Sequence, residues 1–251
     1  MIDRSSREGV TMLRMNREPA NVLDLEFGDA ITDALTEAAD DDSTSAIVLT
    51  GTDSVFSGGV DLFRVLEEGP DYLTGFFGSL NRLFQTAAGC PRPLVAAING
   101  HAIAGGAVLA FACDFRVMAR GPAKIGLPEL DVGVPFPGSA LGIIRRAVPD
   151  RFLKEIVLRG VILGCQAALE KTLVDELAAP EEVLDRAVTL AAELGSVSTP
   201  AFAVTKALLA TDTLEEAGPL EAEVRRIWSA ADTRDRMRQY LERTLGKRER
   251  G

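Results

Sequence analysis

The sequence predicts an α/β protein with a parallel, βαβ-type core, and three observations support this prediction. The first is the order of a strand pattern at residues 9–16, a helical pattern at 25–39 and a strand at Ala46–Thr50, which is typical of parallel sheets. The second is that Ala46–Thr50 is short and continuously apolar, as expected for a parallel strand with both faces buried. The third lies in residues 98–114, where a β-rich run passes through a small-residue loop into an apolar helix.

The N-terminal elements have clear boundaries. Apolar residues Val10 and Met12 mark the first strand, and residues 19–21 form a turn. Asp24 is placed to cap the helix that follows, because an aspartate side chain accepts hydrogen bonds from the N–H groups of a first helical turn. The acidic run at 40–43 ends this helix, and we interpret it as a solvated loop rather than a metal site.

A glycine-rich loop follows the next strand, in the sequence V-F-S-G-G-V-D-L at residues 55–62. Such a loop presents backbone N–H groups at the edge of a sheet, where ligands of open α/β sheets bind. A plain turn is the alternative that the residues alone leave open. Residues 67–70 are expected to form a linker, 73–88 an amphipathic helix and 93–98 a strand.

The stretch I-N-G-H-A-I-A-G-G-A-V-L-A-F-A-C-D at residues 98–114 is the centre of the sequence. Its helix begins at Gly105 and is apolar on every side, which indicates that it is buried. The N–H groups of its first turn need a partner, and glycine lets a ligand approach the backbone closely. This helix start is therefore a candidate oxyanion site, with tight packing alone as the other interpretation. Asn99, His101 and the glycines argue against a membrane-spanning helix.

Beyond residue 114 the sequence predicts one more strand, at 115–119, and then mainly helices. Judged from its neighbours alone, Glu129 is expected to be a surface or capping carboxylate. Residues 132–138 are expected to form a stiff apolar loop. The helices are expected at residues 139–147, 150–158, 165–172, 180–194, 200–210, 214–231 and 232–245.

Composition and charge exclude several classes of protein. The chain has 251 residues, a formal net charge of −10 and a pI of about 4.8, which argues against nucleic acid as a partner. Three cysteines without a C-x-x-C pair argue against disulfide frameworks and zinc sites, and a charged N-terminus shows no secretory signal, so a cytoplasmic protein is expected. The single histidine, His101, excludes multi-histidine metal sites, and Ser57 has no histidine nearby in sequence for serine-hydrolase chemistry.

Several motifs, taken in order along the chain, resemble those of the crotonase (enoyl-CoA hydratase/isomerase) superfamily. They are P-A-N-V-L-D at 19–24, A-I-V-L-T-G at 46–51, V-F-S-G-G-V-D-L at 55–62, P-L-V-A-A-I-N-G-H-A-I-A-G-G at 93–106, A-C-D-F-R-V at 112–117, I-G-L-P-E at 125–129, L-E-K-T-L-V-D-E at 169–176, T-P-A-F-A-V-T-K at 199–206 and R-Q-Y-L-E-R at 238–243. The resemblance implies an α/β fold with a crotonase-type (ββα)n spiral core. The core and its acyl-CoA site are expected at residues 1–195, and a helical C-terminal trimerisation region at 196–251.

The resemblance also implies that the protein binds acyl-CoA thioesters and polarises the thioester carbonyl with two backbone N–H groups. By motif position these groups belong to Val60 and Gly105, and Glu129 matches one of the two glutamates of the hydratases. The other glutamate is replaced by Val108, and an aspartate that marks dienoyl-CoA isomerases is replaced by Pro137. The usual I-P-G-x-G-G-T loop is replaced by V-P-F-P-G-S, which is expected to reshape the acyl pocket.

One carboxylate is enough for a proton shuttle but too few for concerted addition of water. The resemblance therefore favours a Δ3-Δ2-enoyl-CoA isomerase in which Glu129 carries a proton from C2 to C4 of the substrate. Two alternatives stay open: a hydratase or another crotonase reaction, with Glu67, Glu68 or Asp71 as the missing acid, and a non-catalytic acyl-CoA-binding homologue. The isomerase hypothesis requires Glu129 to face the same cavity as the two oxyanion amides.

The expected substrate-binding residues surround these catalytic positions. CoA is expected near residues 56–64, with its phosphates near Arg64, Lys206 and the basic pair Lys247 and Arg248. Neither a cofactor nor a metal is implied, because CoA is part of the substrate. The full set of binding residues is Phe56, Ser57, Gly58, Gly59, Asp61, Leu62, Arg64, Ala104, Gly106, Val108, Pro135 and Lys206.

A homotrimer or a dimer of trimers is expected as the assembly. Apolar Leu208, Leu220, Val224 and Ile227 lie on predicted C-terminal helices that need a partner to cover them.

Overall fold

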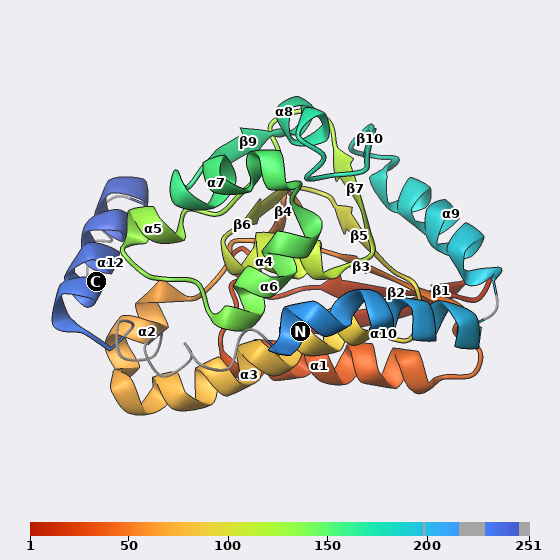
Figure 1. Cartoon of the computed structure of the whole chain (residues 1–251), viewed down its shortest axis with the longest axis horizontal. Helices are drawn as coiled ribbons and strands as arrows, with labels where there is room; N and C mark the ends of the chain where they lie inside the picture. Colours follow the sequence, from red (N-terminus) through yellow and green to blue (C-terminus); the bar gives the residue numbers. More distant parts are fainter. Residues whose placement is uncertain (198, 216–228, 246–251) are drawn as a thin grey trace.

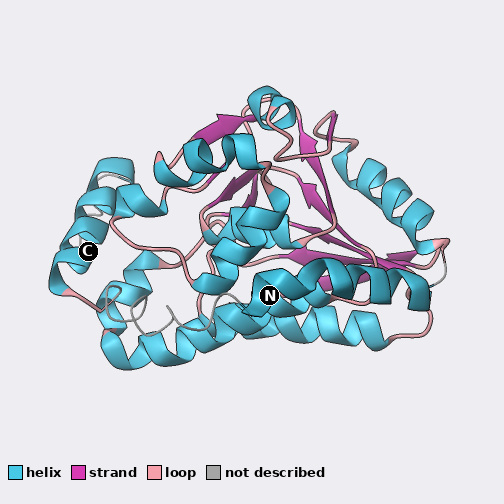
Figure 2. Ribbon diagram, in the orientation of Figure 1, coloured by secondary structure: helices cyan, strands magenta, loops and turns pink. Residues whose placement is uncertain are grey.

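Figure 1 shows the protein, a computed structural model in which residues 1–197, 199–215 and 229–245 are described. The strands of this part of the chain form two sheets (Figure 2). The larger sheet has the order β1-β2-β3-β5-β7-β10, with strands Ile2–Arg7, Val10–Met15, Ala46–Thr50, Leu94–Ile98, Phe115–Ala119 and Glu176–Ala178. The smaller sheet has the order β4-β6-β8-β9, with strands Val55–Ser57, His101–Ile103, Lys124–Gly126 and Ile162–Gly164.

Parallel pairing dominates both sheets. In the larger sheet every neighbouring pair from β2 to β10 is parallel, and in the smaller sheet β4, β6 and β8 are parallel. The pairs β1–β2 and β8–β9 are antiparallel and close one edge of each sheet. The predicted α/β class with a parallel core is therefore confirmed.

Helices connect and cover these strands. Their bounds are α1 Leu25–Asp40, α2 Leu62–Glu68, α3 Pro70–Gly89, α4 Gly105–Ala112, α5 Glu129–Val132, α6 Gly138–Ala147, α7 Asp150–Leu158, α8 Cys165–Glu170, α9 Val183–Gly195, α10 Thr199–Glu215 and α12 Ala231–Leu245. In Figure 1, α1 and α3 run side by side along the base of the molecule, and α9, at the right, lies on the other side of the larger sheet.

The central strands β3 and β5 of the larger sheet are buried at every position, which explains their apolar sequences. In β3, Ile47 and Leu49 belong to the main core, which also includes side chains of α1, α3 and α4. Ala46 and Val48 belong to a second, smaller core that α9 covers. Since successive side chains of a strand point to opposite faces, a strand between two cores needs apolar residues at every position.

Two local predictions for helices are confirmed. The Asp24 side chain accepts a hydrogen bond of 2.9 Å from the Phe27 N–H and so caps α1. The helix α4 begins at Gly105, and each of its eight residues is buried. The N–H groups of its first turn therefore lie in the interior of the protein, as the all-apolar pattern predicted.

Other predictions require correction. Residues 67–70 are not a linker, because Glu67 and Glu68 end α2 and Pro70 begins α3; Gly69 alone, with a φ of 79°, turns the chain between the two helices. The hairpin strand β1 and the short strands β6, β8, β9 and β10 were not predicted. Four of these have three residues each, too few to show a period, and pairing with distant strands forms them.

The C-terminal helices follow the prediction where they are described. The helices expected at 139–147, 150–158 and 232–245 are α6, α7 and α12, with boundaries within one residue. The expected helix at 214–231 falls almost entirely outside the described residues, and so do Lys247 and Arg248 and the side chains of Leu208, Leu220, Val224 and Ile227. In the part of the chain that is described, no single helix has the length and apolar character needed to cross a membrane, although the bent pair Val183–Gly195 and Thr199–Ala207 meets both criteria together.

Candidate active site

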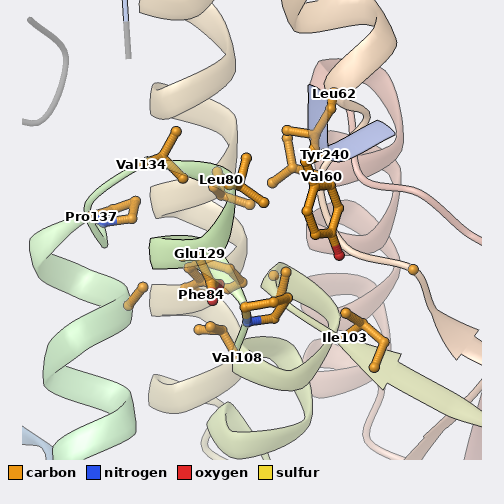
Figure 3. Close-up of a pocket in the computed structure, with 16 residues that line it drawn as sticks. Val60, Leu62, Leu80, Phe84, Ile103, Val108, Glu129, Val134, Pro137 and Tyr240 are labelled. Carbon is orange, nitrogen blue, oxygen red and sulfur yellow. The ribbon is translucent and has the colours of Figure 1, made fainter. Parts of the chain in front are cut away.

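A small apolar cavity of about 70 Å³ lies between the glycine-rich loop after β4, the start of α4 and the helices α3, α5, α6 and α12 (Figure 3). Apart from Glu129 and Tyr240, its lining carries no polar side chain among the described residues. The lining residues are Gly58, Val60, Leu62, Leu80, Phe84, Ile103, Ala104, Gly105, Val108, Pro128, Glu129, Val132, Val134, Pro137, Ala140 and Tyr240.

Among the described residues of this lining, Glu129 is the one carboxylate. The residue is only 8 % exposed, and its Oε2 atom has no hydrogen-bond partner in the described part of the chain. Burial disfavours the charged form and raises the pKa of Glu129 to about 8. The expectation of a surface or capping carboxylate is therefore wrong. Pro128 and the short helix α5 bring Glu129 inward, which the flanking residues alone do not reveal.

Val60 and Gly105 line the same cavity as Glu129. Within the described residues, neither the Val60 N–H nor the Gly105 N–H donates a hydrogen bond to a protein acceptor. The two amides are close together, since a Cβ built on Gly105 would lie 3.8 Å from the Val60 nitrogen. Buried N–H groups without acceptors are rare and costly, so two of them beside one cavity form a site for an oxygen atom of a ligand.

Two glycines make this arrangement possible by allowing close backbone packing. Gly59 has a φ of 88°, and a Cβ there would lie 2.6 Å from the Ile103 oxygen. A Cβ on Gly106 would lie 2.4 Å from the Ser57 oxygen. Both contacts are impossible for a side chain, so the loop after β4 and the start of α4 approach each other only with glycine at these positions.

Four of the predicted binding residues support the loop without lining the cavity. Phe56 and Ser57 are fully buried, and the Ser57 hydroxyl donates to the Asn21 oxygen and accepts from the Gly59 N–H. Asp61 caps α2 by accepting from the Arg64 N–H at 3.0 Å. Gly106 packs against Ser57. These positions shape the loop after β4 and are not part of the cavity lining, which is also true of Gly59.

The predicted phosphate-binding cations already have carboxylate partners. Arg64 pairs with Asp24 at 2.8 Å and with Glu26, and its side chain is 27 % exposed. Lys206 is 4 % exposed, pairs with Asp114 at 2.8 Å and lines a second cavity. Lys206 therefore does not lie at the cavity of Glu129. Pro135 is also outside the lining, whereas its neighbours in the same loop, residues 134 and 137, belong to it.

No second carboxylate faces Glu129 in the described part of the chain. Val108, which the motif resemblance places where the hydratases carry their other glutamate, lines the cavity and is 1 % exposed. Glu67, Glu68 and Asp71, the candidates for a missing acid, are exposed and are not part of the lining. Among the described residues, no three His, Cys, Asp or Glu side chains are grouped so that they could hold a metal ion.

Tyr240 is a site residue that the sequence analysis missed. It lies on α12, more than a hundred residues from Glu129 in sequence, and its ring lies beside Val60 in Figure 3. Burial raises its pKa, and the nearby Asp131 and Glu129 carboxylates act in the same direction. A tyrosine on a polar C-terminal helix gives no sequence signal of this role, because only the docking of α12 brings it to the cavity.

Comparison with known proteins gives a consistent result. Residues 5–247 match the protein family described as enoyl-CoA hydratase/isomerase. The chain is 36 % identical over 196 residues to a putative enoyl-CoA hydratase of Thermus thermophilus, covering 76 % of each chain. The crystal structure of human mitochondrial Δ3-Δ2-enoyl-CoA isomerase is similar with a TM-score of 0.91 and 27 % identity, over 100 % of this chain and 99 % of that one. An enoyl-CoA hydratase structure from Mycobacterium ulcerans is similar with a TM-score of 0.82 and 27 % identity, over 90 % and 99 %.

Proposed function

The chain belongs to the enoyl-CoA hydratase/isomerase family, and we propose that within it the protein is a Δ3-Δ2-enoyl-CoA isomerase. The observation that carries this proposal is the apolar cavity itself. Among the described residues it contains a single buried carboxyl with a free oxygen, Glu129, and two amides without an acceptor. A reaction that moves one proton needs one such group, whereas the addition of water needs groups to hold and ionise the water.

The proposed reaction has two proton transfers. The thioester carbonyl oxygen of a 3-enoyl-CoA accepts hydrogen bonds from the Val60 and Gly105 N–H groups, which makes the C2 proton acidic. Glu129 removes that proton, and the electron pair spreads over C2 to C4 and the carbonyl oxygen as a dienolate. Glu129 then returns the proton to C4, the double bond forms between C2 and C3, and the carboxylate is restored.

The environment of Glu129 suits both halves of this cycle. A carboxyl with a pKa of about 8 gives up and takes back a proton with little free-energy difference near neutral pH. Because the base is the ionised form, kcat/KM is expected to rise with pH and to level off above about pH 8. Val108 beside Glu129 keeps the cavity apolar, so water has no second polar partner there.

An enoyl-CoA hydratase is the second candidate, because the Thermus thermophilus relative has that name. The same carboxyl and amides would serve that reaction if another group held the water. The isomerase would convert 3-enoyl-CoA with Glu129 alone, whereas the hydratase would add water to 2-enoyl-CoA and needs a further group. Assays with 3-enoyl-CoA and with 2-enoyl-CoA therefore separate the two candidates.

For the CoA part of the substrate, we propose that its phosphates bind near Arg64, with Lys247 and Arg248 as further cations. Arg64 is the described member of this group, and it lies two residues beyond Leu62 of the cavity lining. Affinity for CoA is expected to fall with rising salt, because ions screen charge pairs at a surface. Unchanged affinity in both Arg64→Ala and a truncation after Leu245 would contradict this placement.

We further propose a homotrimer or dimer of trimers in the cytoplasm, acting without a cofactor or metal. Val204 and Leu209 of α10, which are 61 % and 65 % exposed, support an assembly in which a second copy covers this helix. Light scattering that shows only a monomer at micromolar concentration would contradict the assembly, and cell fractionation tests the location.

The decisive experiment is a spectrophotometric assay with a series of 3-enoyl-CoA and 2-enoyl-CoA substrates. We expect conversion of 3-enoyl-CoA to 2-enoyl-CoA and much slower hydration of 2-enoyl-CoA. Rapid hydration with no isomerisation would replace the proposal by the hydratase. Tight binding of acyl-CoA with neither reaction would instead indicate a non-catalytic homologue.

A further inference from the structure

The cavity that contains Glu129 has a buried floor and a partly exposed mouth. The floor consists of the lining residues that are buried in the core, among them Val108 and Glu129 itself. The CoA part of a substrate carries phosphates and cannot lie among apolar side chains, so it leaves the cavity through the mouth. The mouth consists of the lining residues that keep some contact with solvent, which are Gly58, Val60, Leu62, Ile103, Ala104 and Tyr240.

Tyr240 differs from the rest of the mouth in its origin and in its chemistry. The other mouth residues belong to the loop after β4, the start of α2 and the segment from β6 to α4, whereas Tyr240 comes from α12. Its side chain is the only polar or aromatic one in the mouth. In Figure 3 the Tyr240 ring lies beside Val60, which carries one of the two oxyanion amides. The ring therefore contacts both solvent and the end of the cavity where the carbonyl is expected to bind.

The helix α12 is docked so that it holds this ring in place. It contacts both α5 and α2, which contribute to the floor and to the mouth of the cavity. Met237 and Leu241 are 0 % and 8 % exposed and anchor α12 in the core. Arg234 of the same helix donates a hydrogen bond to the Leu66 oxygen in α2. Tyr240 is thus a fixed part of the mouth.

The dry environment of Glu129 is what the mouth protects. Burial raises the pKa of Glu129 to about 8, and a bond from its own backbone N–H acts in the opposite direction. Among the described residues, no charged side chain contributes to this shift of the pKa. The walls from α3, α4 and α6 are apolar, and the charged groups near Tyr240, besides Glu129, are the exposed Asp131 of α5 and Arg243 of α12. Access of water is therefore the variable that decides the protonation of Glu129.

We propose that Tyr240 is a positioning residue that closes the mouth of the cavity against water and so keeps Glu129 in the dry environment that its proton transfers need. This inference rests on the proposed function for the role of Glu129, and it assigns control of that carboxyl to the C-terminal helix. The aromatic ring supplies the cover, because apolar surface excludes water. The hydroxyl has a partner of its own in Thr244. Loss of the ring should let water reach Glu129 and favour the ionised carboxylate.

The test measures the protonation of Glu129 directly, in the enzyme without substrate. Ordinary aspartates and glutamates have a pKa of about 4 and are ionised above about pH 6. A protonated-carboxyl band in the infrared spectrum above that pH is therefore expected to belong to Glu129, and its absence in Glu129→Gln checks the assignment. In wild type the band is expected to disappear with a midpoint of about pH 8.

The variants separate the ring from the hydroxyl. Tyr240→Ala is expected to lower the midpoint by about one pH unit or more, because water then stabilises the ionised form. Tyr240→Val also removes the ring, with a smaller change in volume, and should shift the midpoint in the same direction. Tyr240→Phe keeps the ring and should keep the wild-type midpoint. The matched control is Gln239→Ala, since Gln239 is an exposed neighbour on the same helix. Thermal unfolding establishes that each variant is folded.

An unchanged midpoint in whichever of the two truncated variants folds would overturn the role of Tyr240. A Tyr240→Phe midpoint as low as that of Tyr240→Ala would also overturn it, because the hydroxyl would then be responsible. With 3-enoyl-CoA as substrate, the midpoint of kcat/KM against pH should move together with the infrared midpoint, and a kinetic midpoint that stays in place would contradict the inference. A shifted infrared midpoint in a protein that isomerises no 3-enoyl-CoA would instead support the closure by Tyr240 and contradict the isomerase proposal.

Discussion

Glu129 and Asp24 are both buried carboxylates at the start of a helix, and their environments have opposite effects. Asp24 is 1 % exposed and accepts hydrogen bonds from Arg17, from Arg64 at 2.8 Å and from the Phe27 N–H at 2.9 Å. Burial alone would raise its pKa, but the hydrogen bonds from Arg17, Phe27 and Arg64 outweigh it, so the pKa of Asp24 is lowered. Glu129 has no charged donor among the residues that the structure describes, and burial raises its pKa to about 8.

The difference shows that burial by itself does not decide what a carboxylate does. A buried carboxylate with charged donors stays ionised and holds parts of the fold together, here α1 with the loop before it and α2. A buried carboxylate that faces an apolar cavity without donors carries a proton that it can release. The following predictions test this contrast from the largest expected effect to the smallest.

Replacing Glu129 should have the largest effect on activity. Glu129→Gln keeps the size of the side chain but cannot carry a proton, so isomerase kcat is expected to fall by roughly 10²–10⁴-fold. The affinity for saturated acyl-CoA should change little, because the Val60 and Gly105 amides remain. Normal turnover by Glu129→Gln would contradict the assignment. The matched control is Glu67→Gln, an exposed glutamate outside the cavity, which should keep full activity.

The same substitution should change how stability depends on pH. The folded-state pKa of Glu129, about 8, lies above the unfolded value of 4.5, so the folded state binds this proton more tightly. Wild type therefore loses free energy of unfolding as pH rises from about 4.5 to about 8, and the loss is at most about 5 kcal/mol. Glu129→Gln has no such loss. We subtract the free energy of unfolding of wild type from that of Glu129→Gln, both measured by urea denaturation from pH 5 to 9. This difference should increase with pH up to about pH 8. A difference that does not change with pH would contradict the raised pKa.

Removing Asp24 should destabilise the protein. Asp24→Ala deletes the cap of α1 and leaves Arg17 and Arg64 without their shared carboxylate, so we expect a loss of about 2–3 kcal/mol near pH 7. Both arginines keep some contact with water, which limits the loss. Urea denaturation measures the effect. Asp185→Ala is the control, since Asp185 pairs with Arg7 at an exposed surface and its loss should be close to zero.

Adding a second carboxylate beside Glu129 should have the smallest catalytic effect. Val108→Glu places a carboxylate where, by the motif resemblance, the hydratases carry their other glutamate. Hydration of 2-enoyl-CoA is therefore expected to rise by about 10-fold at most, below the roughly 10²–10⁴-fold that a well-placed acid or base contributes. The gain is limited because the new carboxyl is buried without donors and therefore favours its neutral form. The same assay series measures it, with Val108→Gln as the uncharged control. An equal gain in Val108→Gln would show that carboxylate chemistry is not the cause.

Much of the fold was predictable from the sequence. Apolar runs identified β3 and β5, a strand was predicted where β7 lies, Asp24 marked the start of α1, and the all-apolar pattern after Gly105 identified the buried helix α4. The ordered motifs predicted the crotonase-type fold, which the similarity to human mitochondrial Δ3-Δ2-enoyl-CoA isomerase confirms. These features are local, because each depends on a pattern or a hydrogen bond within a few residues.

The sequence by itself determined the class of the fold and the two glycine-rich loops. Its I-G-L-P-E motif at residues 125–129 also singled out Glu129 as the candidate carboxylate. Only the tertiary structure decided that Glu129 is buried without a donor, that Phe56 and Ser57 support the loop from behind, and that Lys206 pairs with Asp114. It also decided that Tyr240, from the far end of the chain, forms a wall of the cavity. The physical reason is that the pKa and accessibility of a side chain depend on neighbours from distant segments. Local sequence sets the helix or strand, and packing sets what surrounds it.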